Sequence, residues 1–135
     1  MSNTDVVRNT YEAFSRGDMQ TVLSAMDPKI EWREAEGNPY MPSGEPWIGP
    51  ENILNNLFLK LGTEWEPFTV HPKTYHDAGD TIIVEARYTG KYKETGKNMD
   101  IQVCHVWRVE EGKLTKFQQY LNTAELQNVM GVRSG

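Results

Sequence analysis

The sequence predicts an α+β domain in which helices pack against one face of a sheet. Apolar residues in the first third recur at helical spacing, whereas apolar and polar residues alternate through most of the second half. Glycine-containing turns at 77–80, 94–97 and 110–113 separate the alternating runs, as turns do in β-hairpins. The expected order of elements is α-α-β-α-β-β-β-β, with an antiparallel sheet in the second half.

Three helices are expected in the first half of the chain. The first is capped by Thr4 or Asp5 and ends at Gly17. The second ends at Asp27-Pro28, and the third runs from Pro50 to Gly62. Their apolar faces are, in chain order, Val6, Val7, Tyr11 and Phe14; Met19, Val22, Leu23 and Met26; and Ile53, Leu54, Leu57, Phe58 and Leu61.

Strands are expected at 30–34, 66–76, 81–92, 99–109 and 114–122, followed by a short helix from a Thr123 cap to Met130. Residues 35–50 are rich in proline and glycine, which predicts a loop. Because this loop carries Tyr40, Met41, Trp47 and Ile48, we expect it to pack against the fold. Loops of this length in small domains are often functional.

Composition limits the kinds of partner that the chain can have. Its 135 residues suit one domain, 1–135, and its net charge of −5 argues against nucleic acid and anionic membranes as partners. No apolar stretch is long enough for a bilayer, and the first residues lack a secretory signal. Cys104 is the single cysteine, which excludes an intramolecular disulfide and agrees with a cytoplasmic location.

Glu34 stands out as a carboxylate on an apolar strand face. A period of two places Ile30, Trp32 and Glu34 on the same side of the first strand. Desolvation there would raise the pKa of Glu34, as a general acid or base near neutral pH requires. The run itself leaves open the alternative that Glu34 bends out into water at the strand end.

Two later strands also carry a polar residue among apolar neighbours. His105 interrupts the alternating apolar set from Met99 to Val109, and Gln119 shares a face with Thr115, Phe117 and Leu121. The turn at 110–113 places His105 opposite position 118 or 119. Glu34, His105 and Gln119 therefore either satisfy one another or line a cavity that holds water or ligand. A core histidine bonded to a backbone carbonyl or a serine, or one that touches water at the end of the sheet, remains the alternative for His105.

Metal and cofactor chemistry is not expected. His71 and His76 are five residues apart in one strand, which predicts opposite faces, and the glycines form no phosphate-binding loop. Four tryptophans, at 32, 47, 65 and 107, either form part of a ligand cage or pack in the core. The sequence predicts neither a metal site nor a cofactor.

Several segments together resemble the NTF2-like superfamily, and within it the SnoaL-like and ketosteroid-isomerase-like proteins. They are residues 11–18, 30–34, 47–53, 105–114 and 119–123. The resemblance implies an antiparallel or mixed curved sheet that wraps as a cone around the N-terminal helices and encloses a deep pocket. It also implies a homodimer through the convex face of the sheet.

The resemblance extends in part to the site. Glu34 falls where the isomerases carry their catalytic aspartate base, and His105 falls near their oxyanion-hole acid if this hairpin is one residue shorter. Thr10 stands where their oxyanion tyrosine is expected, with Tyr11 beside it and turned about 100° around the helix. The polyketide cyclases carry an acid/base aspartate where this chain has Gln119, and an amide cannot transfer that proton.

These inferences predict cofactor-independent acid/base chemistry on a small hydrophobic compound carrying a carbonyl, lactone or epoxide. Glu34 would move the proton and His105 would bond the oxygen that gains charge. The other expected ligand-binding residues are Tyr11, Phe14, Trp32, Tyr40, Trp47, Phe58, Tyr88, Val103, Trp107, Phe117, Gln119 and Leu121. Two alternatives stay open: a ligand-binding module without catalysis, and an interaction protein whose cone is filled by side chains.

Overall fold

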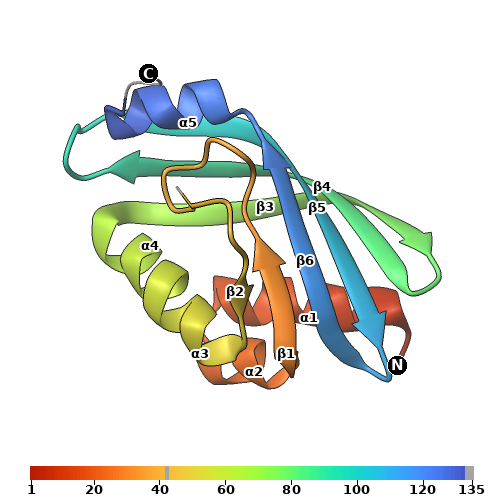
Figure 1. The fold of residues 1–135 in the computed structure, drawn as a ribbon. Helices are drawn as coiled ribbons and strands as arrows, with labels where there is room; N and C mark the ends of the chain where they lie inside the picture. The colour runs from red at the N-terminus through yellow and green to blue at the C-terminus, as the bar shows by residue number, and fades with distance from the viewer. Residues whose placement is uncertain (42, 133–135) are drawn as a thin grey trace.

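A six-stranded mixed sheet forms the body of the computed structural model, which describes residues 1–41 and 43–132 (Figure 1). Its spatial order is β2-β1-β6-β5-β4-β3, with β1 and β6 parallel and the other neighbours antiparallel. The two ends of this order do not pair, so the sheet is open. Its strands are β1 (Met26–Arg33), β2 (Trp47–Ile48), β3 (Trp65–Ala78), β4 (Thr81–Tyr92), β5 (Asn98–Glu110) and β6 (Lys113–Leu121).

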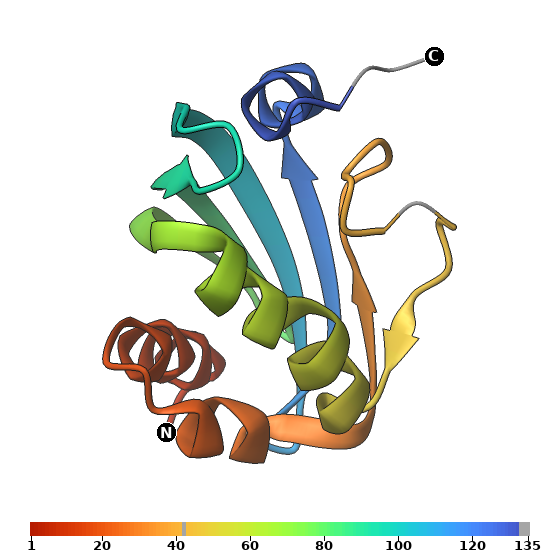
Figure 2. The ribbon, with the colours of Figure 1, turned by 90° about the vertical axis from the view of Figure 1, so that its left-hand side faces the viewer.

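The helices lie on one side of the curved sheet, which confirms the predicted α+β architecture. Figure 2 shows α1 to α4 on this inner side and α5 across one end of the strands. A π-helical segment, Leu54–Phe58, joins α3 to α4 in one continuous rod. The helices are α1 (Asn3–Ser15), α2 (Met19–Ser24), α3 (Pro50–Ile53), α4 (Leu59–Glu64) and α5 (Thr123–Met130).

The predicted N-caps of the first and the last helix each lie slightly too late in the chain. Ser2, not Thr4 or Asp5, caps α1, because its Oγ accepts from the Asp5 backbone N–H at 3.1 Å and the Asp5 carboxylate accepts from the Ser2 N–H. Asn122 caps α5 in the same way, its Oδ1 accepting from the Glu125 N–H at 3.1 Å. Thr123 is therefore the first residue of the helix rather than its cap.

Two helix ends also differ from the prediction. Met26 was expected in the second helix, but it begins β1, since that helix already ends at Ser24. Gly62 was expected to end the third helix, yet it lies inside α4, which continues to Glu64. Glycine costs only about 1 kcal/mol in a helix interior, and the helix ends where Trp65 begins to pair with β4.

Bulges in two strands change which residues face inward. In β6, Val109 pairs with Leu114 and Arg108 pairs with Lys116, so Thr115 is an extra residue and Leu114 takes the buried position. The expectation that Thr115 faces inward is therefore wrong. Beyond the bulge the predicted alternation holds, and His105 lies directly opposite Gln119.

The bulge in β3 lies between Pro72 and Thr74. His71 pairs with Arg87 and His76 with Ile83, two β4 residues that share the outer face. The prediction that the two histidines face opposite sides is therefore wrong, because one extra residue shifts the alternation.

The segment between β1 and α3 packs onto the fold as expected. Asn38 and Met41 are buried, and Tyr40 is half-buried. Its last part is less irregular than predicted, because Trp47 and Ile48 form β2 against β1. Pro42, which contributed to the loop prediction, lies outside the described residues.

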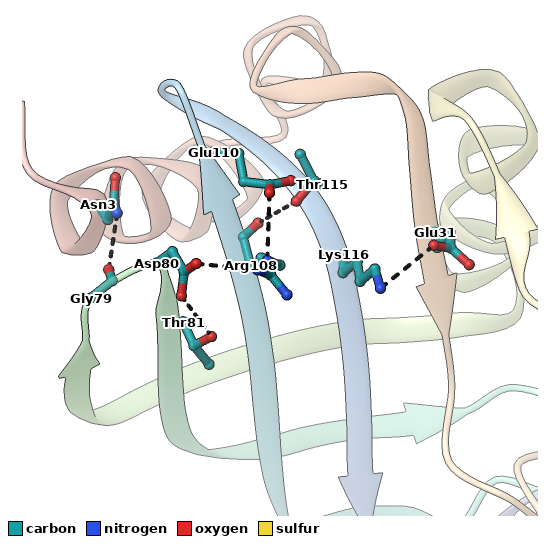
Figure 3. A network of polar contacts seen from close by, with 9 residues as sticks. All are labelled: Asn3, Glu31, Gly79, Asp80, Thr81, Arg108, Glu110, Thr115 and Lys116. Atoms are coloured by element: carbon teal, nitrogen blue, oxygen red, sulfur yellow. Dashed lines mark hydrogen bonds and ion pairs between the residues drawn. The ribbon is translucent and has the colours of Figure 1, made fainter.

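The outer face of the sheet carries ion pairs (Figure 3). Arg108 reaches Asp80 at 3.3 Å and Glu110 at 3.7 Å, and Lys116 reaches Glu31 at 3.9 Å across the parallel β1–β6 pair. All five side chains are about half exposed. Among the described residues, no helix has the length and apolar character needed to cross a membrane.

Candidate functional site

A cavity of about 60 Å³ lies between the helices and the inner face of the sheet. This volume has room for roughly four water molecules. Aromatic and aliphatic side chains form most of its wall, with a small number of polar groups among them. The lining residues are Thr10, Tyr11, Phe14, Val22, Trp32, Glu34, Asn38, Tyr40, Leu57, Phe58, Leu61, Trp65, Phe68, Val70, Tyr88, His105, Trp107, Phe117, Gln119, Leu121 and Leu126.

Glu34 and His105 both line this cavity, together with most of the side chains that the sequence suggested as ligand-binding. Trp47 and Val103 do not. Trp47 lies on β2, at the edge of the sheet, where it packs on the rim of the core. Val103 is buried two residue pairs beyond His105 along β5, on the same face of the sheet.

Nine lining residues were not predicted as part of the site. Leu57 and Leu61 lie on a helix face that was assigned to the core, so their pattern could have suggested them. Asn38 had no such signal, because it lies in an irregular segment without periodicity. The nine are Thr10, Val22, Asn38, Leu57, Leu61, Trp65, Phe68, Val70 and Leu126.

Glu34 is a buried carboxyl group with 7% of its surface exposed. Trp32 Nε1 donates to its Oε2 at 3.3 Å. Burial raises the pKa of Glu34 from 4.5 to about 8, although the hydrogen bonds from Trp32 and Gln119 act against the rise. No described lining residue is Lys or Arg, so the carboxyl group is mostly protonated at pH 7.

His105 lies between two tyrosines. Its Nδ1 is 2.6 Å from the Tyr11 hydroxyl and its Nε2 is 2.5 Å from the Tyr88 hydroxyl. Burial lowers the pKa of His105 from 6.5 to about 3, so the imidazole is neutral at pH 7. Trp107 Nε1 donates to the Tyr11 hydroxyl at 2.8 Å, which extends the network to a fourth ring.

Tyr11 reaches this network from α1. Helical periodicity turns it about 100° from Thr10, the position where the isomerases carry their oxyanion tyrosine. Both residues line the cavity, but they differ in what they can offer a ligand. Thr10 Oγ1 donates to the Val6 carbonyl at 2.8 Å, a bond within its own helix. Burial raises the pKa of Tyr11 and of Tyr88, so both stay phenols at neutral pH.

Gln119 connects the network to the segment after β1. Its Oε1 accepts from Asn38 Nδ2 at 2.8 Å and from the Ala35 N–H at 3.2 Å. Its Nε2 donates to the Tyr88 hydroxyl at 2.9 Å. The amide is thus bonded at both ends, as a buried polar group requires.

Tyr40 links the segment between β1 and α3 to the end of α4 and the start of β3. Its hydroxyl donates to Glu64 Oε1 at 2.6 Å and accepts from Trp65 Nε1 at 2.8 Å. Tyr40 and Trp65 both line the cavity, so this bond set closes one part of its wall. Within the described residues, no three His, Cys, Asp or Glu side chains gather as a metal site would need.

The open mixed sheet, the helices on its inner face and the enclosed cavity give the chain the architecture of an NTF2-like protein. The family model described as a SnoaL-like domain matches residues 7–117. The chain therefore belongs to the SnoaL-like domain family. No curated protein matches the chain in sequence.

Solved structures agree with this assignment. An NTF2-like protein from Burkholderia thailandensis is 35% identical, with a TM-score of 0.90 over 96% of this chain and 98% of that one. A candidate SnoaL-like polyketide cyclase from Jannaschia is 15% identical, with a TM-score of 0.80 over 98% and 93%. A protein of ketosteroid-isomerase-like fold from Catenulispora acidiphila, in complex with trimethylamine, is 16% identical, with a TM-score of 0.77 over 95% and 93%.

Proposed function

We propose that the protein is a cofactor-independent acid/base enzyme acting on a small hydrophobic compound that carries a carbonyl, lactone or epoxide. The observation that carries this proposal is the buried Glu34 carboxyl group, which shares its cavity with the neutral His105 network. A carboxyl group that titrates near 8 can accept or release a proton at physiological pH.

Glu34 is the proton-transferring group in this proposal. As a carboxylate it takes a proton from the carbon next to the ligand carbonyl, and the electron pair moves to the carbonyl oxygen. Returning the proton to another carbon completes an isomerisation. As a carboxylic acid it instead protonates the ring oxygen of an epoxide or lactone while a water molecule bonds to the adjacent carbon and the C–O bond breaks, and the water then returns a proton to the carboxylate. One positioned acid or base contributes about 10²–10⁴ in rate.

A phenol of the network supplies the hydrogen bond to the oxygen that gains charge. The sequence suggested His105 for this role, but both of its ring nitrogens already pair with tyrosine hydroxyls. Tyr11 and Tyr88 line the same cavity, so their hydroxyls are the donors that this proposal assigns to the ligand oxygen. Loss of one such donor typically costs about 10²–10³ in rate.

The cavity limits the size of the ligand. Its 60 Å³ suits a molecule of a few heavy atoms unless the wall moves. The segment with Asn38 and Tyr40 is the part of the wall that we expect to move. Hydrogen bonds from Asn38 to Gln119 and from Tyr40 to Glu64 hold it in place. Larger ligands would therefore require these hydrogen bonds to break first.

The experiment is a thermal-shift screen with small ketones, lactones and epoxides, followed by turnover assays on each hit. A ligand at about a hundred times its dissociation constant stabilises the fold by roughly 2.7 kcal/mol. Glu34→Gln should bind the same hit without turning it over. Glu31→Gln is the matched control, since Glu31 lies on β1, three residues before Glu34, with its side chain half-exposed on the outer face. Equal turnover by Glu34→Gln and wild type would refute the proposal.

The pH–rate profile separates the two roles of Glu34. If it acts as a base, kcat/KM rises with pH and levels off above about 8. If it acts as an acid, kcat/KM falls above the same value. A profile without any inflection near 8 would remove Glu34 from the chemical step.

A ligand-binding module without catalysis is the second candidate. Gln119 favours it, because an amide bonded to Asn38 and Tyr88 cannot shuttle a proton. A module of this kind would show thermal shifts but no turnover with any hit, in wild type and Glu34→Gln alike.

We also propose that two copies pair through the outer face of the sheet. Tyr120, on β6, exposes 57% of its surface on that face, which supports an apolar contact there. Light scattering should report a dimer for the wild type and a monomer for Tyr120→Lys. A monomeric wild type would refute the pairing.

A further inference from the structure

The His105 network contains one hydrogen more than its two contacts with the tyrosines use. A neutral imidazole has one N–H donor and one bare nitrogen acceptor. Each ring nitrogen of His105 faces a phenol hydroxyl, Tyr11 at Nδ1 and Tyr88 at Nε2. One phenol must therefore donate to the ring, and the other must accept from it.

Both phenol oxygens already accept one further hydrogen bond whose direction is fixed. Trp107 Nε1 can only donate, and it donates to Tyr11. Gln119 donates to Tyr88 through Nε2 because its Oε1 accepts from Asn38 Nδ2 and the Ala35 N–H. Asn38 is itself oriented, since its Oδ1 accepts from the Tyr40 N–H at 2.9 Å.

Only two arrangements of hydrogens satisfy these contacts. With the proton on Nε2, His105 donates to Tyr88 and Tyr11 donates to Nδ1, which leaves the Tyr88 O–H without a partner in the ring. With the proton on Nδ1, His105 donates to Tyr11 and Tyr88 donates to Nε2, which leaves the Tyr11 O–H unused. In each arrangement exactly one phenol retains a hydrogen for a ligand.

We propose that His105 is a positioning residue whose tautomer selects which tyrosine, Tyr11 or Tyr88, turns its O–H toward the ligand oxygen. The catalytic use of that hydroxyl rests on the proposed function, whereas the choice of tautomer does not. The selected oxygen accepts two N–H donors, which polarises its own O–H and makes it a stronger donor.

Glu34 couples to this choice through Tyr88. The titratable residues that line the cavity are Glu34, His105, Tyr11, Tyr40 and Tyr88. Burial raises the pKa of the Tyr88 phenol, and the charge of ionised Glu34, which lines the same cavity, raises it further. A nearby negative charge also attracts hydrogens. In the Nε2–H tautomer the Tyr88 oxygen accepts two N–H hydrogens, one from His105 and one from Gln119, whereas in the Nδ1–H tautomer it accepts only the one from Gln119. Ionisation of Glu34 therefore favours the Nε2–H tautomer.

Two phenylalanine variants should trap opposite tautomers. In Tyr11→Phe a proton on Nδ1 would be a buried donor without an acceptor, so the proton moves to Nε2. In Tyr88→Phe the same argument moves it to Nδ1. Long-range ¹H–¹⁵N spectra of ¹⁵N-histidine protein distinguish a protonated from a bare ring nitrogen. His71 and His76, on the outer face, serve as internal references for the fold.

Opposite tautomers in the two variants at pH 7 are the expected result. The same tautomer in both, or an imidazolium with two N–H groups in the wild type, would overturn the proposal. If either variant fails to fold, the wild type provides the test by itself, because its Nε2–H fraction should rise as pH passes about 8 and should stay constant in Glu34→Gln. A constant fraction in the wild type would then overturn the coupling. These spectra need no substrate, so failure of the tautomer choice and failure of the enzymatic proposal are separate results.

Discussion

The polar side chains on the two faces of β4 and β5 differ in burial and in charge. On the inner face Tyr88 and His105 are buried, uncharged and hydrogen-bonded. On the outer face Arg87 and Asp100 form an ion pair at 2.8 Å, with 44% and 69% of their side chains exposed. The same alternating strands thus carry a neutral network on one side and solvated charges on the other.

The difference shows where electrostatics can affect function in this molecule. Water screens the outer pairs, so each contributes only about 0–1 kcal/mol to stability. On the inner face desolvation dominates, and it moves the pKa of Glu34 up and that of His105 down until both groups are neutral at pH 7. The predictions below test this contrast, from the largest expected effect to the smallest.

Glu34 should make the protein less stable as pH rises. The folded state keeps the proton up to about pH 8, whereas the unfolded state releases it near 4.5, so stability falls between these values. The full change corresponds to about 5 kcal/mol. Denaturant unfolding of wild type and Glu34→Gln between pH 4 and 9 measures it as a difference that grows with pH. A constant difference would mean that Glu34 has an ordinary pKa in the folded state.

His105 should have the opposite effect at lower pH. The unfolded state binds its proton near 6.5 and the folded state only near 3, so stability rises with pH between these values. Between about 4.5 and 6.5 the two effects oppose each other, which predicts a plateau. In His105→Gln, stability should fall from pH 4.5 upward, without that plateau, when the same unfolding series is measured.

Tyr11→Phe should destabilise the fold by about 1–3 kcal/mol, because it leaves the Trp107 N–H and one His105 nitrogen without partners. Tyr120→Phe is the control, since it removes the same hydroxyl from a side chain that is exposed in the single chain and keeps the ring. Denaturant midpoints at pH 7 measure both. A cost for Tyr11→Phe no larger than for Tyr120→Phe would contradict the account of the buried network.

Arg108→Gln should have the smallest effect, below about 1 kcal/mol, although it removes contacts to both Asp80 and Glu110. The loss should shrink further in about 1 M salt, where the screening length is only about 3 Å. Thermal unfolding at two salt concentrations checks it. A large, salt-independent loss would show that the outer face depends on more than solvated charge.

The sequence predicted those parts of the fold that follow a regular period. Alternation placed Ile30, Trp32 and Glu34 on one buried face, and the hairpin turn placed His105 opposite Gln119. Bulges cannot be predicted in this way, because the extra residue at Thr115 changes the facing of its neighbours without changing their chemistry. The same reason accounts for His71 and His76.

The network within the cavity was less predictable than the cavity itself. Hydrogen bonds such as Tyr11 to His105 join residues 94 positions apart, and their existence depends on where α1 crosses the sheet. Asn38, which orients Gln119, lies in a segment whose composition predicts a loop but not its path. Such contacts follow from tertiary packing and leave no periodic signal.

The central claim is that the cavity keeps Glu34 protonated at neutral pH. Carbon-13 NMR of the carboxyl groups of ¹³C-glutamate protein tests it directly, with Glu34→Gln identifying the resonance by its absence. The account predicts that this resonance titrates with a midpoint near 8. A midpoint near 4.5 would contradict it and would remove the basis for acid/base chemistry at this site.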